Sequence, residues 1–132
     1  MSESTQGSTK VNNLGVVMFT VADQDAAIAF YTQKLGWELR GDMSFGPNNE
    51  NRWVEVAPPG STTRLALNPP MGSQPGGGAI GVETRDLDGE HARLTAVGGI
   101  DMEPEPMTPP GAPRMFMLRD PDANVVVVVE VD

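Results

Sequence analysis

Few side chains in this chain are suited to chemistry. Its 132 residues contain no cysteine and a single histidine, His91, and no serine lies in a recognisable nucleophile motif. The glycines at 76–78 precede an expected strand rather than a helix, so they do not form a phosphate-binding loop. Two glutamates are better placed, because Glu55 and Glu83 lie within expected strands. A buried strand carboxylate can act as a general acid or base, whereas one at a strand end or sheet edge simply meets water.

Two stretches of the chain follow the same plan. Each has an apolar strand ending in acidic residues, a helix closed by glycine, and then two or three strands. Asp23 caps the first helix and Gly36 ends it, while Asp86 or Asp88 caps the second and Gly98 ends it. Expected strands cover residues 14–21, 37–45, 52–56, 63–67, 79–84, 114–118 and 124–129.

Three features of the second stretch indicate how its elements pack. His91 lies on the inward stripe of the second helix, which favours a packing role. Five prolines between residues 104 and 113 limit that segment to a broken edge strand and a long loop. The five valines at 125–129 predict a central strand covered on both faces.

The domain organisation follows from these segments. We expect an unstructured tail over residues 1–10 and a single domain over residues 11–132. Within the domain, module one covers residues 14–69 and module two covers residues 79–131. The linker at 70–78 is too rich in glycine and proline for regular structure.

Two motifs carry a family resemblance. The segment "FYTQKLGWELR" after the first strand, and "LRDPDANVVVVVE" near the C-terminus, resemble the vicinal oxygen chelate superfamily. That group includes glyoxalase I, extradiol dioxygenases and bleomycin-resistance proteins. The resemblance implies an α+β fold of two βαβββ modules forming a cupped, incomplete barrel. It also implies a site inside the cup and a homodimer.

The metal ligands of that family have no counterpart here. The resemblance places them at Val16, at Ala79, at Val127 and, depending on strand register, at Leu65 or Ala66. All these side chains are apolar, whereas a divalent metal needs several nitrogen or oxygen ligands converging on one point. We therefore expect no metal and no other cofactor.

What the expected cup offers is apolar, polarizable surface. Methionines adapt to irregular shapes, and an indole provides a flat stacking surface. Core packing explains many of these side chains equally well, but Trp53 lies in a short hairpin where a large ring more often meets a ligand or partner. The candidate ligand-binding residues are Val16, Met18, Met43, Phe45, Trp53, Glu55, Leu65, Leu67, Glu83, Met107, Met115 and Met117.

These features favour a metal-independent protein that binds an aromatic, antibiotic-like small molecule and confers resistance by sequestration. The bleomycin-resistance branch is the nearest analogue. One alternative is a metal-independent lyase, isomerase or cyclase that uses Glu55 or Glu83 as its base. Another is a degenerate module that serves only as an interaction domain.

Charge and composition limit the partners. The net charge is −9 and is unevenly distributed. Residues 1–72 contain 5 basic and 7 acidic residues, a net charge of −2, and residues 73–132 contain 4 basic and 11 acidic residues, a net charge of −7. Such a surface repels nucleic acid and would attract a cationic ligand, although it can equally serve solubility. No apolar run is long enough to span a membrane and the N-terminus lacks a signal-peptide core, so we expect a cytoplasmic protein.

Overall fold

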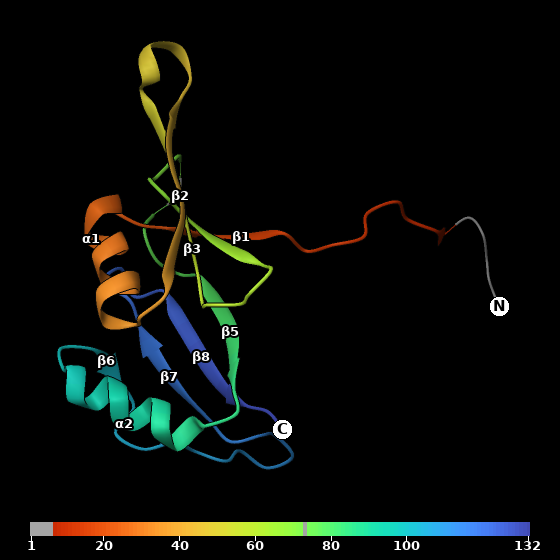
Figure 1. The fold of residues 1–132 in the computed structure, drawn as a ribbon, viewed down its shortest axis with the longest axis vertical. Coiled ribbons are helices and arrows are strands. Elements are labelled where there is room, and N and C mark those ends of the chain that lie inside the picture. Colours follow the sequence, from red (N-terminus) through yellow and green to blue (C-terminus); the bar gives the residue numbers. More distant parts are fainter. Residues whose placement is uncertain (1–6, 73) are drawn as a thin grey trace.

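The computed structural model describes residues 7–72 and 74–132, which form two four-stranded sheets and two main helices (Figure 1). The sheet orders are β1-β4-β3-β2 and β5-β8-β7-β6. The parallel pairs are β1 with β4 and β5 with β8, and all other neighbouring strands are antiparallel. The first module contains β1 (Val16–Thr20), α1 (Gln24–Ala29), β2 (Glu38–Phe45), β3 (Asn51–Ala57) and β4 (Arg64–Asn68). The second contains β5 (Ala79–Thr84), α2 (Leu87–Val97), β6 (Asp101–Met102), β7 (Met115–Arg119) and β8 (Val125–Glu130). This arrangement confirms the expected α+β fold.

Both helices begin and end at the residues that the sequence indicates. The Asp23 carboxylate accepts a hydrogen bond from the backbone nitrogen of Ala26 at 3.0 Å. Asp86, rather than Asp88, caps α2 by accepting from the nitrogen of Gly89 at 2.9 Å. Gly36 and Gly98 follow the two helices with φ of 78° and 76°, a left-handed conformation that glycine adopts without strain.

The first helix nevertheless changes form part-way. After Ala29 the chain continues as a π-helical turn over Phe30–Lys34, in which the nitrogen of Leu35 donates to the carbonyl oxygen of Phe30 at 3.1 Å. Phe30 and Tyr31 in this turn are both buried, with their rings edge to face at 5.2 Å. The sequence pattern did not predict it.

The strands agree with the expectations in most places. The proline-rich segment between α2 and β7 has little strand pairing, as its prolines predict. Among the described residues, it forms only the two-residue β6 and an isolated bridge between Met107 and Met115. The valine strand β8 lies centrally, between β5 and β7. The expectation that β8 is covered on both faces is wrong for the single chain. Val126 and Val128 are buried, whereas Val125, Val127 and Val129 on the other face are only partly buried.

One hydrophobic core serves both modules. Side chains from both sheets and both helices form a single buried cluster, and α1 and α2 lie on the same side of the molecule in Figure 1. Each sheet contributes one face to this core. The opposite face of each sheet is left open. The largest side chains of this core that are fully buried are Tyr31, Phe116, Leu67, Leu87, Leu94 and Leu118.

A buried carboxylate joins the modules. Asp120, in the loop between β7 and β8, is 5% exposed. Its Oδ2 atom accepts hydrogen bonds from Tyr31 Oη at 3.0 Å and Asn124 Nδ2 at 3.1 Å, and its Oδ1 atom accepts from the nitrogens of Asp122 and Asn124, both at 2.9 Å. Asn124 also donates to the carbonyl oxygen of Thr20 at 3.1 Å. The last loop of module two is thus bonded to the first strand and helix of module one.

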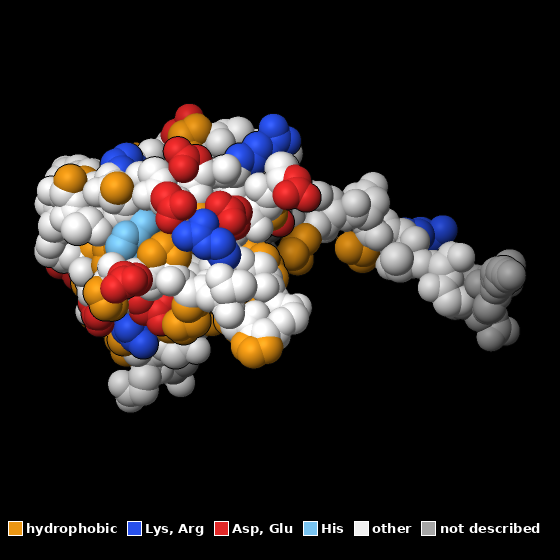
Figure 2. All heavy atoms as spheres, turned by 90° about the horizontal axis from the view of Figure 1, so that it is seen from below, with side chains coloured by type: hydrophobic (Ala, Val, Ile, Leu, Met, Phe, Trp, Pro, Cys, Tyr) orange, Lys and Arg blue, Asp and Glu red, His pale blue; other side chains and the backbone are white. Residues whose placement is uncertain are grey.

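The N-terminal segment and the surface complete the description. Residues 7–15 lead away from the body, and Val11 is 75% exposed (Figure 2). The predicted tail begins in residues 1–6, which lie outside the described residues. Figure 2 also shows acidic and basic side chains interspersed on this face, without a gathering of lysines and arginines. No helix in the described part of the chain is long and apolar enough to cross a membrane.

The junction between the modules predicts the effect of a small substitution. Tyr31→Phe deletes the hydroxyl that donates to the buried Asp120, so we expect the free energy of unfolding to fall by about 1–3 kcal/mol in urea titrations. Ser44→Ala, which removes a hydroxyl from an exposed position on β2, is the control and should change little. An equal effect of the two substitutions would contradict the proposed importance of this bond.

Alkaline titration provides a second measurement on the same contact. Burial, and then the neighbouring Asp120, raise the pKa of Tyr31 far above its usual value of about 10. The folded chain therefore keeps a proton that the unfolded chain loses, and its stability falls as the pH rises above about 10. Tyr31 is the single tyrosine, so tyrosinate absorbance should appear only together with unfolding. Tyr31→Phe should lack this contribution to the pH dependence.

Candidate functional site

The open face of the first sheet brings together most of the side chains that sequence analysis selected from module one. Strand register places Val16 opposite Arg64, Met43 opposite Trp53, and Ala66 opposite both Met18 and Glu55. Three of the apolar side chains are strongly exposed in the single chain: Met18 at 60%, Met43 at 61% and Phe45 at 47%. We call this surface, made of Val16, Met18, Met43, Phe45, Trp53, Glu55, Arg64 and Ala66, the first open face.

The second sheet has a corresponding surface. Its register places Glu83 opposite Val129, and Met115 and Met117 opposite Val129 and Val127. Met107 joins this surface through its bridge to Met115. The second open face consists of Ala79, Gly81, Glu83, Met107, Met115, Met117, Val125, Val127 and Val129.

Two of the predicted ligand-binding residues lie elsewhere. Leu65 and Leu67 are 3% and 0% exposed and belong to the shared core, so the prediction that they line the open sheet face is wrong. Because side chains alternate along a strand, Arg64 and Ala66 are the residues of β4 that lie on the open side of the sheet instead. Ala66 is itself 0% exposed but is not part of the shared core cluster, so Arg64 is the residue of β4 that is accessible there. The other ten predicted residues share the two open faces. Their role in ligand binding stays a prediction.

A chain of polar contacts crosses the first open face. Trp53 Nε1 donates to Glu55 Oε2 at 2.9 Å, which fixes the orientation of the indole. Arg64 Nε donates to Glu55 Oε1 at 2.7 Å. Both oxygens of Glu55 therefore already accept a hydrogen bond from a neighbouring side chain. Sequence reasoning missed Arg64, although its position two residues before Ala66 places it on the same strand face.

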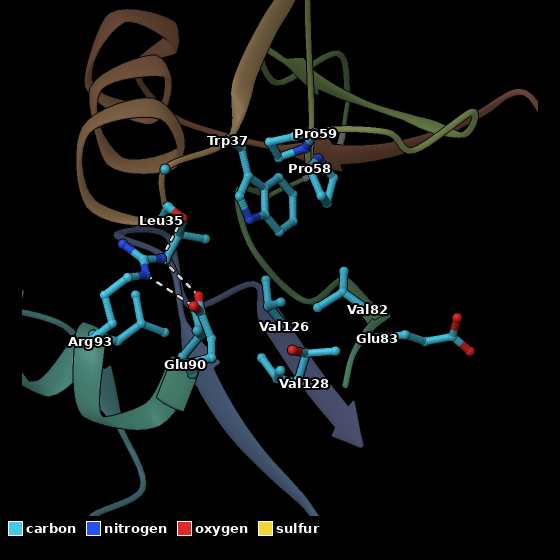
Figure 3. Close-up of a pocket in the computed structure, with 14 residues that line it drawn as sticks. Leu35, Trp37, Pro58, Pro59, Val82, Glu83, Glu90, Arg93, Val126 and Val128 are labelled. Atoms are coloured by element: carbon cyan, nitrogen blue, oxygen red, sulfur yellow. Dashed lines mark hydrogen bonds and ion pairs between the residues drawn. The ribbon is translucent and has the colours of Figure 1, made fainter. Parts of the chain in front are cut away.

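Glu83 and His91 have simpler surroundings. Glu83 is exposed, and in Figure 3 its carboxylate points away from Trp37 and the valines. His91 Nε2 lies 2.9 Å from the carbonyl oxygen of Glu103, and its ring meets Phe116 edge to face at 4.9 Å. The packing role expected for His91 agrees with these contacts.

The residues at the family's ligand positions do not fit a divalent metal. In the second module Val127 pairs with Gly81, two residues after Ala79, and in the first module Ala66 pairs with Met18, two residues after Val16. Ala66 rather than Leu65 is therefore the equivalent of Val127, and the four positions are Val16, Ala66, Ala79 and Val127. None of these side chains has a donor atom. Among the residues that the structure describes, no three histidine, aspartate or glutamate side chains converge on a common point.

A cleft between the modules is a second possible binding place. It has a volume of about 350 Å³, and Trp37, Pro58 and Pro59 form one wall, facing Val82, Val126 and other side chains of the second sheet (Figure 3). At one end Arg93 Nη2 donates to the carbonyl oxygen of Leu35 and to Glu90, both at 2.7 Å. A neighbouring cleft of about 820 Å³ shares Trp37 and reaches Leu65. No sequence pattern predicted these clefts, because they arise from how the modules pack together.

Comparison with known proteins agrees with this geometry. Residues 13–128 match the glyoxalase/bleomycin resistance protein/dioxygenase superfamily. The chain belongs to this superfamily. Its curated relatives include the uncharacterized protein YetH of Bacillus subtilis (strain 168), which is 31% identical over 91% of this chain and 99% of YetH.

Solved structures of the superfamily have the same fold. A member from Sphaerobacter thermophilus DSM 20745 superimposes with a TM-score of 0.83 and 33% identity, over 93% of this chain and all of that one. TnmS3, an antibiotic binding protein from Streptomyces sp. CB03234, superimposes with a TM-score of 0.81 and 29% identity, over 95% of this chain and all of TnmS3. The two-module architecture is therefore that of the superfamily.

The apolar ligand positions make metal content a direct test. Untagged protein dialysed against Ni²⁺, Zn²⁺, Mn²⁺ or Fe²⁺ and then against buffer should keep less than about 0.2 equivalents of metal, because valine and alanine cannot coordinate it. Elemental analysis by mass spectrometry measures this content. A stoichiometric metal that raises the melting temperature would show that the assignment of the ligand positions is wrong.

Proposed function

We propose that this protein binds a planar aromatic, antibiotic-like small molecule without a metal and protects the cell by sequestering it. The observation that carries the proposal is the first open face, where Met18, Met43 and Phe45 are 47–61% exposed beside Trp53. Exposed apolar patches of this kind usually mark a ligand or partner site. Methionine side chains adapt to the outline of a ring system, and the indole offers a flat surface for stacking.

Sequestration requires affinity alone. Nanomolar binding corresponds to about −12 kcal/mol, which a drug-sized ring system can reach when most of its surface is buried in an apolar groove. The Trp53 indole is held by Glu55 before any ligand arrives, so little conformational entropy is lost on stacking. TnmS3, an antibiotic binding protein with the same fold, adds support for a ligand of this kind.

The contacts of the two candidate bases favour binding over catalysis. Glu55 Oε1 and Oε2 both already accept hydrogen bonds, from Arg64 and Trp53, which leaves this carboxylate poorly placed to take a proton from a ligand. Glu83 is exposed on an outer strand of the second sheet. The lyase, isomerase or cyclase alternative therefore lacks a specific observation in its favour.

We further propose that the chain works as a cytoplasmic homodimer. Each open face is half of a groove, since a single sheet can contact only one side of a flat ligand. The outer strands β1 and β5 are sheet edges, and the cleft of about 820 Å³ beside them is lined by apolar residues such as Val17 and Ile80. A second copy would cover these edges and complete the groove.

Tryptophan fluorescence distinguishes the two possible binding places. Polycyclic aromatic antibiotics should quench Trp53 and saturate near one ligand per groove, and Trp53→Ala should weaken binding by roughly 1–3 kcal/mol. Trp53→Phe should abolish the quenching, while Trp37→Phe should retain it, because Trp37 lies in the cleft between the modules. The reverse result would move the site to the cleft. The ligand should be recovered unchanged, and its turnover, lost on Glu55→Gln or Glu83→Gln, would replace sequestration by catalysis.

Assembly is tested by light scattering. The expected mass is about twice the 14.1 kDa of one chain. Gly81→Lys should shift the population toward monomer, because a Cβ at Gly81 meets nothing within 4 Å in the single chain but would meet a partner that covers β5. Gln33→Lys adds the same charge at an exposed position on the helical side and should leave the mass unchanged. A wild-type monomer at micromolar concentration would contradict the dimer.

A further inference from the structure

Arg64 differs from most arginines of this chain in what its guanidinium contacts. In the described part of the chain, only its Nε atom makes a side-chain hydrogen bond, to Glu55, and both Nη atoms are left without a protein acceptor. Five other arginines direct Nη atoms to protein oxygens, in hydrogen bonds or an ion pair: Arg40, Arg52, Arg93, Arg114 and Arg119. Their guanidinium groups serve the fold, whereas the fork of Arg64 remains available.

The position of this fork is fixed before binding. Glu55 is 16% exposed and holds Arg64 Nε at 2.7 Å, while Trp53 Nε1 holds the other Glu55 oxygen at 2.9 Å. The Arg64 side chain keeps 39% of its surface exposed. A guanidinium bound along its Nε edge still presents two parallel N–H groups at its end, the geometry that matches a carboxylate.

The surroundings strengthen a contact at this point. Val16 lies directly opposite Arg64 on the parallel strand, and the neighbouring positions on this face hold Met18 and Ala66. Apolar neighbours exclude water once a ring covers them, and charge-assisted hydrogen bonds are stronger where water is excluded. The indole of Trp53 lies on the same face, so a ring stacked there can direct an acidic group toward Arg64.

We propose that Arg64 selects the ligand of the first open face and that this ligand carries a carboxylate on its aromatic ring system. This inference rests on the proposed function, since it assigns the ligand class of the same site. This inference is the opposite of the expectation from the net charge of −9. Taken over the whole molecule, that charge would attract a cationic ligand. At the site itself, Glu55 is the acidic side chain of the first open face and is already paired with Arg64. Glu83 lines the same cleft of about 820 Å³ as Arg64, but it is exposed to water, which screens its charge. The free N–H groups of Arg64 therefore determine the preference at short range.

Three naphthalene derivatives of similar size test the proposal: naphthoate, naphthamide and naphthylmethylammonium. In calorimetric titrations at neutral pH, naphthoate should bind at least about tenfold more tightly than the ammonium compound. Arg64→Met should lower naphthoate affinity by about tenfold and leave naphthamide within a factor of about three, because the amide interacts with an uncharged residue and the ring nearly as well. Arg64→Lys should retain part of the preference, since it keeps the charge without the fork.

The controls separate this inference from the function on which it rests. Arg85→Met removes an exposed arginine outside both open faces and should leave all three affinities unchanged. Retained naphthamide binding shows that Arg64→Met is folded. If all three compounds bind wild-type protein equally well, or if Arg64→Met weakens all three alike, the role of Arg64 is overturned while ring binding stands. If none of them binds, the proposed function fails and this inference fails with it.

Discussion

The buried carboxylate of Asp120 is the constraint on which the architecture depends. A buried, charged group is costly unless it is fully hydrogen-bonded, and this one is satisfied by four donors, one of which is Tyr31 Oη from the other module. The four bonds are made together only when module two lies against the first helix. The bond from Tyr31, together with the bond from Asn124 to the carbonyl oxygen of Thr20, holds the modules in the arrangement that buries one shared core. A consequence is that each sheet buries one face and leaves the other open.

The two motifs that reveal the family therefore serve the fold. Tyr31 comes from "FYTQKLGWELR", and Asp120 and Asn124 come from "LRDPDANVVVVVE". All three are buried where the modules meet, away from the open faces. Recognition of the superfamily from these residues thus depends on a structural contact and carries no information about chemistry. The candidate ligand-binding residues lie mostly on strands whose sequence shows only an alternation of apolar residues.

Sequence reasoning succeeded where a local rule decides the outcome. Aspartate caps, glycine helix ends and prolines act through neighbouring backbone, so both helices and the broken edge segment were predicted. It failed where the outcome depends on long-range packing. Leu65 and Leu67 were assigned to the open face because only strand pairing reveals which parity faces the core. The π-helical turn, the half-exposed β8, and the cleft around Trp37 likewise follow from the way the two modules meet. The same uncertainty explains why Arg64 was missed. Arg64 and Leu65 are adjacent on β4 and face opposite sides of the sheet, so placing Leu65 on the open face placed Arg64 on the wrong one.

The contacts on the first open face support the proposed binding function in a second way. Metal-based chemistry needs several donor atoms that point at one vacant position, and the family's ligand positions here hold valine and alanine. The polar groups that remain, Trp53, Glu55 and Arg64, are bonded mainly to one another, so they form a rigid edge instead of a set of free reactive groups. A rigid polar edge beside adaptable methionines can orient a ligand and hold it. The two hydrogen bonds that fix this edge also occupy both oxygens of Glu55. The same contacts therefore preorganise the edge for the proposed ligand and make Glu55 a poor candidate for a free base.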